Sequence, residues 1–352
     1  MAAKSPNNLI NYRMPAEWEP HAATWLAWPH YEGDWPGKFE PIPWVYAEII
    51  RNLARHERVE LIVNDALSER RARQVLQRAD VPLSNVVFHR WPTNRVWMRD
   101  SGCIFVKDAN GLAGVKWRFN AWAKYSNWKL DEKIGSLMAE VPGVEEVRPL
   151  FGRKRVVLEG GSIDVNGCGT LLTTEECLLS KVQQRNPGMD REAYEQGFAE
   201  YLGATNVIWL GKGISGDDTH GHVDDLSRFV SPDTVVIMVE SNTGDTNHRP
   251  LRDNLRRLHA ARDQAGKRLN IVELPMPRPV IFESRRLPAS YANFYIANNV
   301  VLVPVFNDPN DRIALNTLAE LFASRAIIPI YSGDLVWGLG TMHCMTQQQP
   351  AT

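Results

Sequence analysis

DREAYEQGFAEYLGATNVIWL, residues 190–210, contains the two elements that this chain repeats. Residues 190–203 have the apolar spacing typical of a helix, and a short β-branched strand begins near Val207. The same succession of helix and strand is predicted four more times, with helices over 67–79, 128–141, 251–267 and 312–325, and strands that begin near Val86, Val147, Ile271 and Ile327. The five strand starts are 61, 60, 64 and 56 residues apart. This regular spacing predicts five copies of one supersecondary unit.

Reactive or ionisable residues follow four of the five predicted strands at similar distances. Each lies 12 to 17 residues after the start of its strand, in the loop that comes next, and the four are Asp100, Glu159, His222 and Cys344. Side chains at equivalent points of four repeats would converge on the axis of a ring. In the remaining unit the matching stretch, IFESRRLPASYANF at 281–294, holds no obvious catalytic group.

Two predicted elements fall outside this count, a helix over 43–55 and a strand over 59–64. A further strand around 22–27 can pair with the strand that follows Cys344. Such pairing would close the ring and remove an exposed sheet edge. It would also fix a cysteine that lies only eight residues from the C-terminus, where chains usually fray.

The composition is that of an ordinary soluble globular protein, with 44% hydrophobic and 23% charged residues in a chain of 352. This length suits two domains or one large ring. A net charge of −1 argues against nucleic acid as a partner. No apolar run has the length of a membrane helix, so no membrane association is expected.

The four cysteines form no CxxC pair, so neither a disulfide scaffold nor a zinc site is indicated. Free thiols are typical of a reducing compartment. The N-terminal residues lack the apolar segment of a secretory signal. These features predict a cytoplasmic protein. The sequence is compatible with a homo-oligomer but does not indicate one.

The densest group of ionisable side chains occurs in GDDTHGHVDDLSRFV, residues 216–230. It comprises Asp217, Asp218, His220, His222 and Asp224. On a strand, His222 and Asp224 would point to the same side. From these residues alone, three interpretations stay open: a metal site, an acid–base histidine beside a carboxylate that binds a cation, and a solvated polar loop.

Two shorter motifs also have both a functional and a structural interpretation. Asp100 follows Arg99 directly before a predicted strand, where a carboxylate binds a ligand or caps a turn. Glu159 precedes Gly160–Gly161, a pair that lets backbone approach a ligand closely or forms a bulge.

The motif GLGTMHCMTQQQP, residues 338–350, surrounds Cys344 with glycines and polar residues. A buried structural cysteine is the commonest kind, but a nucleophilic thiolate needs a partly accessible, electropositive setting. His343 adjoins Cys344, yet on a strand it would face away from the thiol. His222 from another repeat is therefore the expected partner.

Four motifs together resemble the agmatine deiminase family, which is grouped with the bacterial-type peptidylarginine deiminases in the guanidine-modifying, or pentein, superfamily. They are WMRD (97–100), LEGG (158–161), DDTHGHVD (217–224) and GLGTMHCMTQQ (338–348). The stretches 14–29 and 34–49 are similar to that family as well. The resemblance implies that residues 1–352 form a single α/β domain, a five-unit propeller with its active site on the axis.

The resemblance also implies a separate role for each residue of the site. Asp100 and Asp224 would bind the guanidinium nitrogens. The thiolate of Cys344 would attack the central carbon, helped by the positive charge of the substrate. His222 would act first as general acid and then as general base, and Glu159 would orient it.

Further implications concern the pocket and the substrate. Trp97 would form an aromatic wall, and Asp218 and Thr219 would shape the same pocket. No metal and no organic cofactor are required. The expected substrate is a small cationic guanidine, agmatine, which water converts to N-carbamoylputrescine and ammonia in putrescine and polyamine biosynthesis.

The chain departs from the family pattern at three positions. Leu339 and Thr341 stand where the family often has Gly and Asn, and Cys103 stands where it often has Pro. Free or peptidyl arginine is therefore the alternative substrate. Two other classes of protein compete with a deiminase: a metal-dependent hydrolase built on His220, His222 and the aspartates, and a tryptophan-rich propeller that only binds ligands. For His220 itself, a supporting or surface role is expected.

Overall fold

The computed structural model describes residues 11–109 and 111–352. The expectation that no secretory signal is present concerns residues 1–10 above all, which lie outside the described ranges. Within those ranges, no helix is long and apolar enough to cross a membrane.

Five β-sheets share one pattern of pairing, in which the first strand is antiparallel to the second and the second is parallel to the third. The sheets consist of β20 (Gln347–Pro350), β1 (His21–Ala27), β2 (Arg58–Val63) and β3 (Val86–Arg90); β4 (Ile104–Asp108), β5 (Gly111–Val115) and β6 (Glu145–Val147); β9 (Asp164–Val165), β10 (Thr170–Thr174) and β11 (Asn206–Leu210); β12 (Ser227–Phe229), β13 (Thr234–Val239) and β14 (Asn270–Pro275); and β17 (Tyr295–Ile296), β18 (Val300–Val305) and β19 (Ala326–Tyr331). Two hairpins add β7 (Leu150–Phe151) with β8 (Lys154–Arg155), and β15 (Ile281–Phe282) with β16 (Arg285–Arg286).

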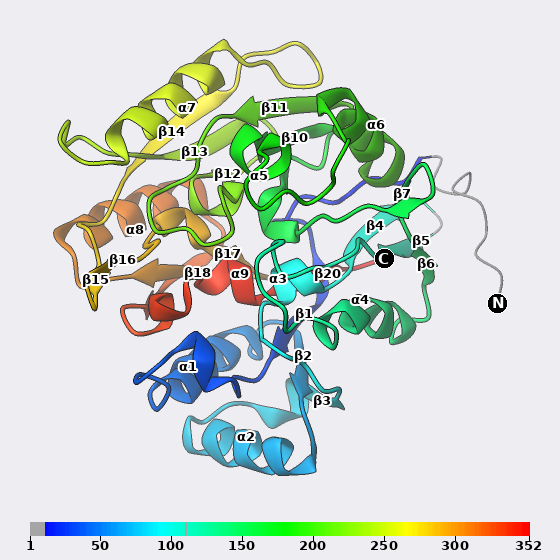
Figure 1. The fold of residues 1–352 in the computed structure, drawn as a ribbon. Helices are drawn as coiled ribbons and strands as arrows, with labels where there is room; N and C mark the ends of the chain where they lie inside the picture. Colours follow the sequence, from blue (N-terminus) through cyan, green and yellow to red (C-terminus); the bar gives the residue numbers. More distant parts are fainter. Residues whose placement is uncertain (1–10, 110) are drawn as a thin grey trace.

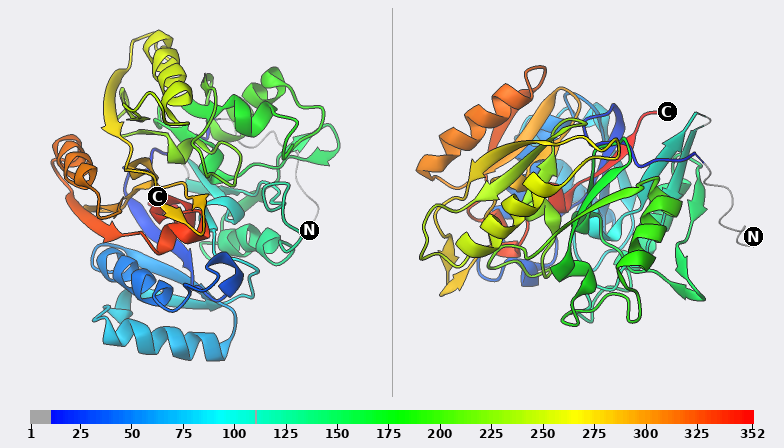
Figure 2. Two further views of the ribbon diagram at one scale, coloured as in Figure 1. Left: turned by 60° about the vertical axis from the view of Figure 1, so that its left-hand side comes forward. Right: turned by 90° about the horizontal axis from the view of Figure 1, so that it is seen from above.

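A helix connects each pair of parallel strands, as such crossovers require. These helices are α1 (Ile42–Leu53), α2 (Ala66–Arg78), α4 (Asp131–Glu140), α6 (Arg191–Leu202), α7 (His248–Ala260) and α8 (Pro309–Leu321); a shorter helix, α5 (Glu175–Leu179), precedes α6. Figure 1 shows the long helices at the periphery, and Figure 2 shows the same arrangement from two further sides. The fold is therefore a mixed α/β fold in which the repeated element is a helix between parallel strands.

Helix α6 illustrates why the repeated stretches fold as they do. The side chain of Asp190 accepts a hydrogen bond from the backbone of Ala193 and so caps the first turn. Tyr194, Phe198, Tyr201 and Leu202 form one buried face. Gly203 ends the helix with φ +67°, a conformation that glycine adopts without strain. Strand β11 then runs parallel to β10.

The helix predicted over 251–267 is shorter in the structure, because α7 ends at Ala260. The carboxylate of Asp263 accepts hydrogen bonds from the backbone nitrogens of Ala265 and Lys267 at 2.8 Å each. Gly266 completes this turn with φ +75°. Local hydrogen bonding by an aspartate therefore competes successfully with continuation of the helix.

The first sheet explains the two elements that did not fit the repeat. Helix α1 and strand β2 form the unit that matches the other four sheets, whereas α2 and β3 add a fourth strand to the edge. The predicted pairing of the two chain ends is confirmed: β1 is antiparallel to β20, with Trp25 opposite Gln347. The C-terminal strand is thus held inside a sheet rather than free.

A short helical turn precedes the first strand of every sheet. The five turns are α3 (Met98–Ser101), η4 (Gly160–Ser162), η5 (Val223–Asp225), η6 (Tyr291–Asn293) and α9 (Met342–Met345). Contacts join α3 to α9 and η4, and η5 to η4 and η6. Figure 1 shows α3 and α9 in the middle of the molecule. These turns carry most of the candidate site.

Candidate active site

Cys344 lies in α9 and lines a cavity of about 110 Å³ with only 6% of its surface exposed. Its Sγ accepts a hydrogen bond from Asn293 Nδ2 at 3.1 Å and lies 3.7 Å from Asp224 Oδ2. Burial raises the pKa of the thiol well above its usual value, and Asp224, Asp225 and Asp100 raise it further, whereas the hydrogen bond from Asn293 lowers it. In this environment the thiol is protonated at neutral pH.

His222 lies at the start of η5 and not on a strand, because β12 begins only at Ser227. The carboxylate of Asp217 accepts hydrogen bonds from the backbone nitrogens of Gly221 and His222 and bends the segment into a turn. The turn nevertheless brings together the two side chains expected to converge. His222 Nδ1 is 4.0 Å from Asp224 Oδ1.

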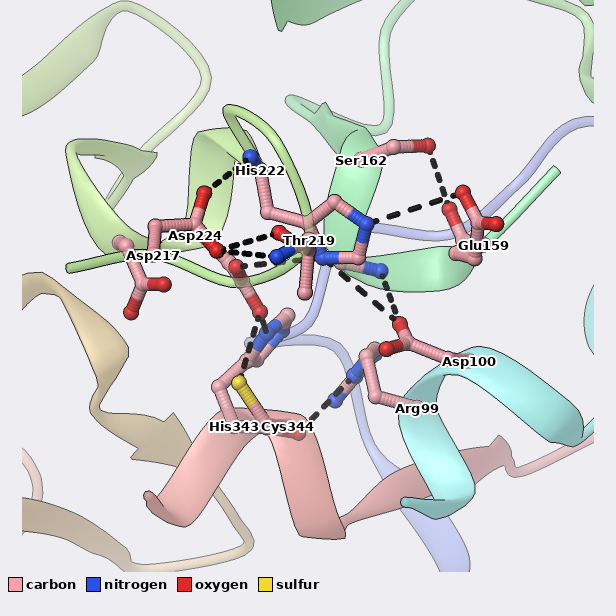
Figure 3. Close-up of polar contacts among 12 residues, drawn as sticks. Arg99, Asp100, Glu159, Ser162, Asp217, Thr219, His222, Asp224, His343 and Cys344 are labelled. Carbon is pink, nitrogen blue, oxygen red and sulfur yellow. Dashed lines mark hydrogen bonds and ion pairs between the residues drawn. The ribbon is translucent and has the colours of Figure 1, made fainter. Parts of the chain in front are cut away.

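Two further carboxylates flank the His222 ring (Figure 3). Nε2 lies 3.7 Å from Glu159 Oε2, and Nδ1 lies 3.9 Å from Asp100 Oδ1. Burial disfavours the charged ring, but Asp100, the thiol of Cys177 and Glu159 together raise the pKa of His222 well above its usual value. The buried ring is therefore an imidazolium at neutral pH.

Arg185 holds Glu159 from the side opposite to His222. Its Nε donates to Glu159 Oε1 at 3.2 Å, and both side chains are buried. Burial opposes ionisation of Glu159, but Arg185 and His222 outweigh it and lower the pKa of that carboxyl. Arg185 Nη2 also donates to the backbone carbonyl of Thr219, so one guanidinium fixes both the carboxylate and the loop before His222.

Asp100 lies in α3 and is buried. Trp122 Nε1 donates to its Oδ2 at 2.8 Å, and the backbone nitrogen of Gly161 donates to its Oδ1 at 3.1 Å. Burial raises the pKa of Asp100 to about 6; His222 opposes that rise, and Asp224 and Glu159 add to it. A neighbouring cation would therefore favour the ionised form of Asp100.

His343 faces Asp224 and not the neighbouring thiol. It lies in helix α9, whereas the sequence-based argument considered a strand. Its Nδ1 lies 2.7 Å from Asp224 Oδ2 and its Nε2 lies 2.9 Å from Glu17 Oε2. Burial opposes ionisation of Asp224, but His343 and His222 lower its pKa. Asp224 is therefore ionised and held by its Oδ2.

Trp97, Asp218 and Thr219, which the sequence assigned to the pocket, all line the cavity beside Cys344. The indole of Trp97 packs against that of Trp35, with ring centroids 5.7 Å apart. Asp218 accepts a hydrogen bond from the hydroxyl of Tyr125 at 2.5 Å and pairs with Lys124. Their contact with substrate stays a prediction.

Glycine is required at two positions next to the reactive groups. A Cβ on Gly161 would lie 2.5 Å from His222 Nδ1 and 3.0 Å from carboxylate oxygens of Asp100 and Asp224. A Cβ on Gly340 would lie 2.7 Å from the Trp97 ring and 3.2 Å from Cys344 Sγ. Any side chain at either position would enter the space between these groups.

His220 is separate from the site. It has φ +68°, and its Nε2 lies 3.0 Å from Ser180 Oγ. Within the described ranges, the side chains close enough to hold a metal ion together are Glu159, Cys177 and His222 in one group and Asp224, Asp225 and Cys344 in another. Neither group contains His220, so the set proposed for a metal-dependent hydrolase is not assembled.

Four buried polar atoms of the site have no hydrogen-bond partner among the described residues. They are both ring nitrogens of His222, Glu159 Oε2 and Asp224 Oδ1. Buried polar atoms without partners are rare in folded proteins and are costly in free energy. Their concentration beside Cys344 indicates a site built to complete its hydrogen bonds with a polar ligand.

Residues 13–350 match the sequence model of the Porphyromonas-type peptidyl-arginine deiminase family. The chain belongs to this family. The resemblance inferred from the four sequence motifs is thereby confirmed. Membership covers nearly the whole chain, including all the residues that surround Cys344.

Relatives of this peptidyl-arginine deiminase family member include an agmatine deiminase from Stutzerimonas stutzeri, which is 35% identical over 97% of this chain and 96% of its own. The solved agmatine deiminase of Enterococcus faecalis has a TM-score of 0.90 at 29% identity, covering 99% of this chain and 98% of its own. A C. jejuni agmatine deiminase with substrate bound, in a variant that has serine for one cysteine, has a TM-score of 0.85 at 29% identity and 96% coverage of both chains.

Several residues around the site of this deiminase-family chain were not identified from the sequence. Arg185, His343 and Glu17 hold the two ionised carboxylates, and Asn293 contacts the thiol. Asn293 corrects the view that the fourth unit offers no group to the site. A sequence signal did exist, because Asn293 lies shortly before a strand, as Asp100 and Cys344 do.

Proposed function

We propose that this protein is an agmatine deiminase, which converts agmatine and water to N-carbamoylputrescine and ammonia. The observation that carries the proposal is the pair of buried carboxylates beside Cys344, Asp100 and Asp224, of which Asp224 Oδ1 has no hydrogen-bond partner among the described residues. A guanidinium supplies N–H donors in a plane, and carboxylates are its natural acceptors. The names of the relatives point to the same substrate.

Substrate binding is assigned to Asp100 and Asp224. Both are buried beside the same nitrogen of the His222 ring, at 3.9 and 4.0 Å from its Nδ1. Each would accept hydrogen bonds from the guanidinium nitrogens, and fixing the group in this way orients its central carbon toward Cys344. Trp97 would cover the alkyl–guanidinium body, and Asp218 and Thr219 would shape the outer part of the cavity.

The nucleophile is assigned to Cys344. Burial and three aspartates raise the pKa of its thiol, so the free enzyme holds it protonated. A bound guanidinium brings a positive charge next to those aspartates and favours the thiolate. Binding of the cation therefore releases the thiol proton to solvent. The thiolate then attacks the central guanidine carbon and forms a C–S bond.

General acid and base catalysis is assigned to His222, with Glu159 as the orienting carboxylate. The imidazolium donates its proton to the departing nitrogen, the C–N bond breaks, and ammonia leaves a thiouronium on Cys344. The neutral ring then takes a proton from water, whose oxygen attacks the same carbon. Cleavage of the C–S bond, with transfer of the hydroxyl proton of the intermediate to the departing sulfur, releases N-carbamoylputrescine and regenerates the thiol.

The wider assignments follow from the same proposal. The five sheets with their common pairing pattern are the units of a single-domain α/β propeller over residues 1–352, and the five short turns bring the site to its axis. The reaction needs neither a metal nor an organic cofactor. The chain is assigned to the cytoplasm and to putrescine biosynthesis.

Leu339 is the residue that bears on the alternative substrates, free arginine and peptidyl arginine. It lines the cavity and adopts φ +70°, a left-handed conformation that costs a non-glycine residue about 1–2 kcal/mol. Glycine would adopt that conformation freely and leave the cavity wider. The leucine side chain therefore favours a slim substrate without an α-carboxylate or peptide, which is agmatine.

The proposal is tested by ammonia release from purified protein with agmatine, free arginine and a blocked peptidyl-arginine, in the presence of EDTA. Cys344→Ala should abolish turnover, because no other group can form the C–S bond. Cys168→Ala is the matched control, since that cysteine is exposed and remote in function. It should keep full activity.

Each outcome decides between the competing functions. Turnover of agmatine alone, lost only in Cys344→Ala, supports the proposal. Turnover of arginine or the peptide instead keeps the chemistry but reassigns the substrate, and Leu339→Gly would then be compared with the wild type. Activity that survives in Cys344→Ala and is lost with EDTA would establish a metal-dependent hydrolase. No ammonia from any guanidine would refute a deiminase.

A further inference from the structure

The sheet formed by β17, β18 and β19 contributes a polar side chain to the site, as the other four sheets do. Asn293 ends the turn η6, two residues before the start of β17, and its side chain is buried next to Cys344. The proposed reaction assigns roles to residues in the turns of the other sheets. It assigns none to Asn293, so the contact between Asn293 and the sulfur needs an explanation.

All hydrogen-bonding positions of the Asn293 amide are used. Nδ2 donates to Cys344 Sγ at 3.1 Å and to Asp225 Oδ1 at 3.0 Å. Oδ1 accepts from Thr341 Oγ1 at 2.9 Å and from the backbone nitrogen of His343 at 3.1 Å. A backbone N–H is only a donor, so the oxygen must face it. The nitrogen of Asn293 therefore faces the sulfur.

An N–H group that points at sulfur stabilises a thiolate more than a thiol, because the hydrogen bond to the charged acceptor is stronger. This contribution is needed here because Asp224, Asp225 and Asp100 all oppose the thiolate. Asp225 accepts the second N–H of the same amide and so fixes its direction. Asn293 contacts the sulfur but does not line the cavity, so it acts on the nucleophile and not on the substrate.

We propose that Asn293 is a catalytic residue whose side-chain N–H holds the sulfur of Cys344 and stabilises its thiolate. The assignment rests on the proposed function as regards turnover, but the thiolate itself can be measured without any guanidine. Its oxygen has a second task, because it holds the backbone of His343 and the hydroxyl of Thr341 and thereby fixes the turn that carries the cysteine.

The test is the rate of Cys344 alkylation by iodoacetamide between pH 7 and 9, measured in a Cys168→Ala background without substrate. Below the pKa of the thiol, this rate is proportional to the thiolate fraction. Asn293→Asp keeps the size and the oxygen but replaces the donor, so alkylation should slow by ~10-fold or more, the equivalent of one pKa unit. Asn293→Ala should slow it similarly. Thr341→Val is the matched control, because it removes a bond to Asn293 Oδ1 without touching the sulfur, and should change the rate by less than about 3-fold.

Turnover provides the second measurement. In the same variants kcat for agmatine should fall by ~10-fold or more while KM changes by less than about 3-fold, because only the nucleophile is affected. Alkylation within 3-fold of wild type in both Asn293 variants would overturn the proposal. So would slow alkylation in Asn293→Asp but not in Asn293→Ala, since the effect would then come from the added charge. If the protein deaminates no guanidine at all, the proposed function fails, and the alkylation result still decides the role of Asn293.

Discussion

At the scale of single residues, the site combines groups whose charges oppose one another in a buried space. His222 is held as an imidazolium among Asp100, Glu159 and Asp224, while the thiol of Cys344 is held neutral by the same aspartates. The first chemical step needs the imidazolium of His222, which is already present, and the thiolate of Cys344, which is not. A cationic substrate supplies the missing charge, so the site is tuned for a ligand of one charge sign.

The acid limb of the pH profile should report Asp100. Its pKa is raised to about 6, so it becomes protonated as pH falls through that value and no longer accepts from a guanidinium. We expect kcat/KM for agmatine to fall about tenfold per unit from pH 8 to 7, because the thiol must lose its proton, and about a hundredfold per unit below pH 6, where Asp100 is protonated as well. Bound cation keeps Asp100 ionised, so kcat itself should fall only at lower pH.

Initial rates at several agmatine concentrations between pH 5 and 8 measure both quantities. A slope of kcat/KM that does not steepen between pH 7 and pH 5 would show that Asp100 is ionised throughout, or that its charge does not matter for binding. His222 does not contribute to this limb, because its pKa is raised and it stays protonated across the range.

At the scale of elements, the sequence was sufficient where a pattern is local. The alternation of helix and strand and the residues of the four motifs depend on neighbours in sequence. The supporting residues depend on contacts across the chain. Glu17 and His343 are 326 residues apart, and Asn293 and Cys344 are 51 apart. No local spacing encodes such a pair, so these roles could not be predicted.

The shape of the short turns was also beyond the sequence. His222 and Asp224 alternate as strand residues do, yet Asp217 binds the backbone of the segment and bends it into η5. The sequence also predicted too late an end for α7, because the carboxylate of Asp263 accepts backbone hydrogen bonds and forms a turn where the helix was expected to continue. In both cases an aspartate side chain takes backbone hydrogen bonds that a regular element would use.

The β1–β20 pairing predicts an energetic coupling between two side chains. Trp25 Nε1 donates to Gln349 Oε1 at 3.1 Å, and both side chains are buried. Gln349→Leu leaves the indole N–H without an acceptor and should lower the free energy of unfolding by about 1–3 kcal/mol. In a Trp25→Phe background, the same change should cost about 1 kcal/mol less, because no donor is left unpaired.

Urea unfolding of the wild type, both single variants and the double variant measures this coupling. Gln196→Leu is a control on α6, away from the two paired strands. If the cost of Gln349→Leu is the same in both backgrounds, the hydrogen bond between the chain ends contributes nothing to stability.

At the scale of the whole molecule, the fold gathers one short turn from each of five sheets around a buried group of like charges. Arg185, Arg228 and Arg99 compensate part of this charge: Arg185 pairs with Glu159, and the other two with Glu17. Asp100 and Asp224 keep no such arginine partner. Arginines therefore support the outer carboxylates, whereas the inner pair lies beside His222 and Asp224 also contacts His343, so a substrate cation adds to the charge of the His222 imidazolium. The central claim is that this inner pair presents a guanidine carbon to Cys344.

That claim is tested most directly by the covalent intermediate. Enzyme mixed with agmatine is quenched in acid at successive times, digested, and analysed by mass spectrometry of the peptide that contains Cys344. The account predicts a transient increase equal to agmatine less ammonia on Cys344 alone, which disappears when agmatine is exhausted. An unmodified Cys344 peptide at every time, while agmatine is consumed at an undiminished rate, would contradict it.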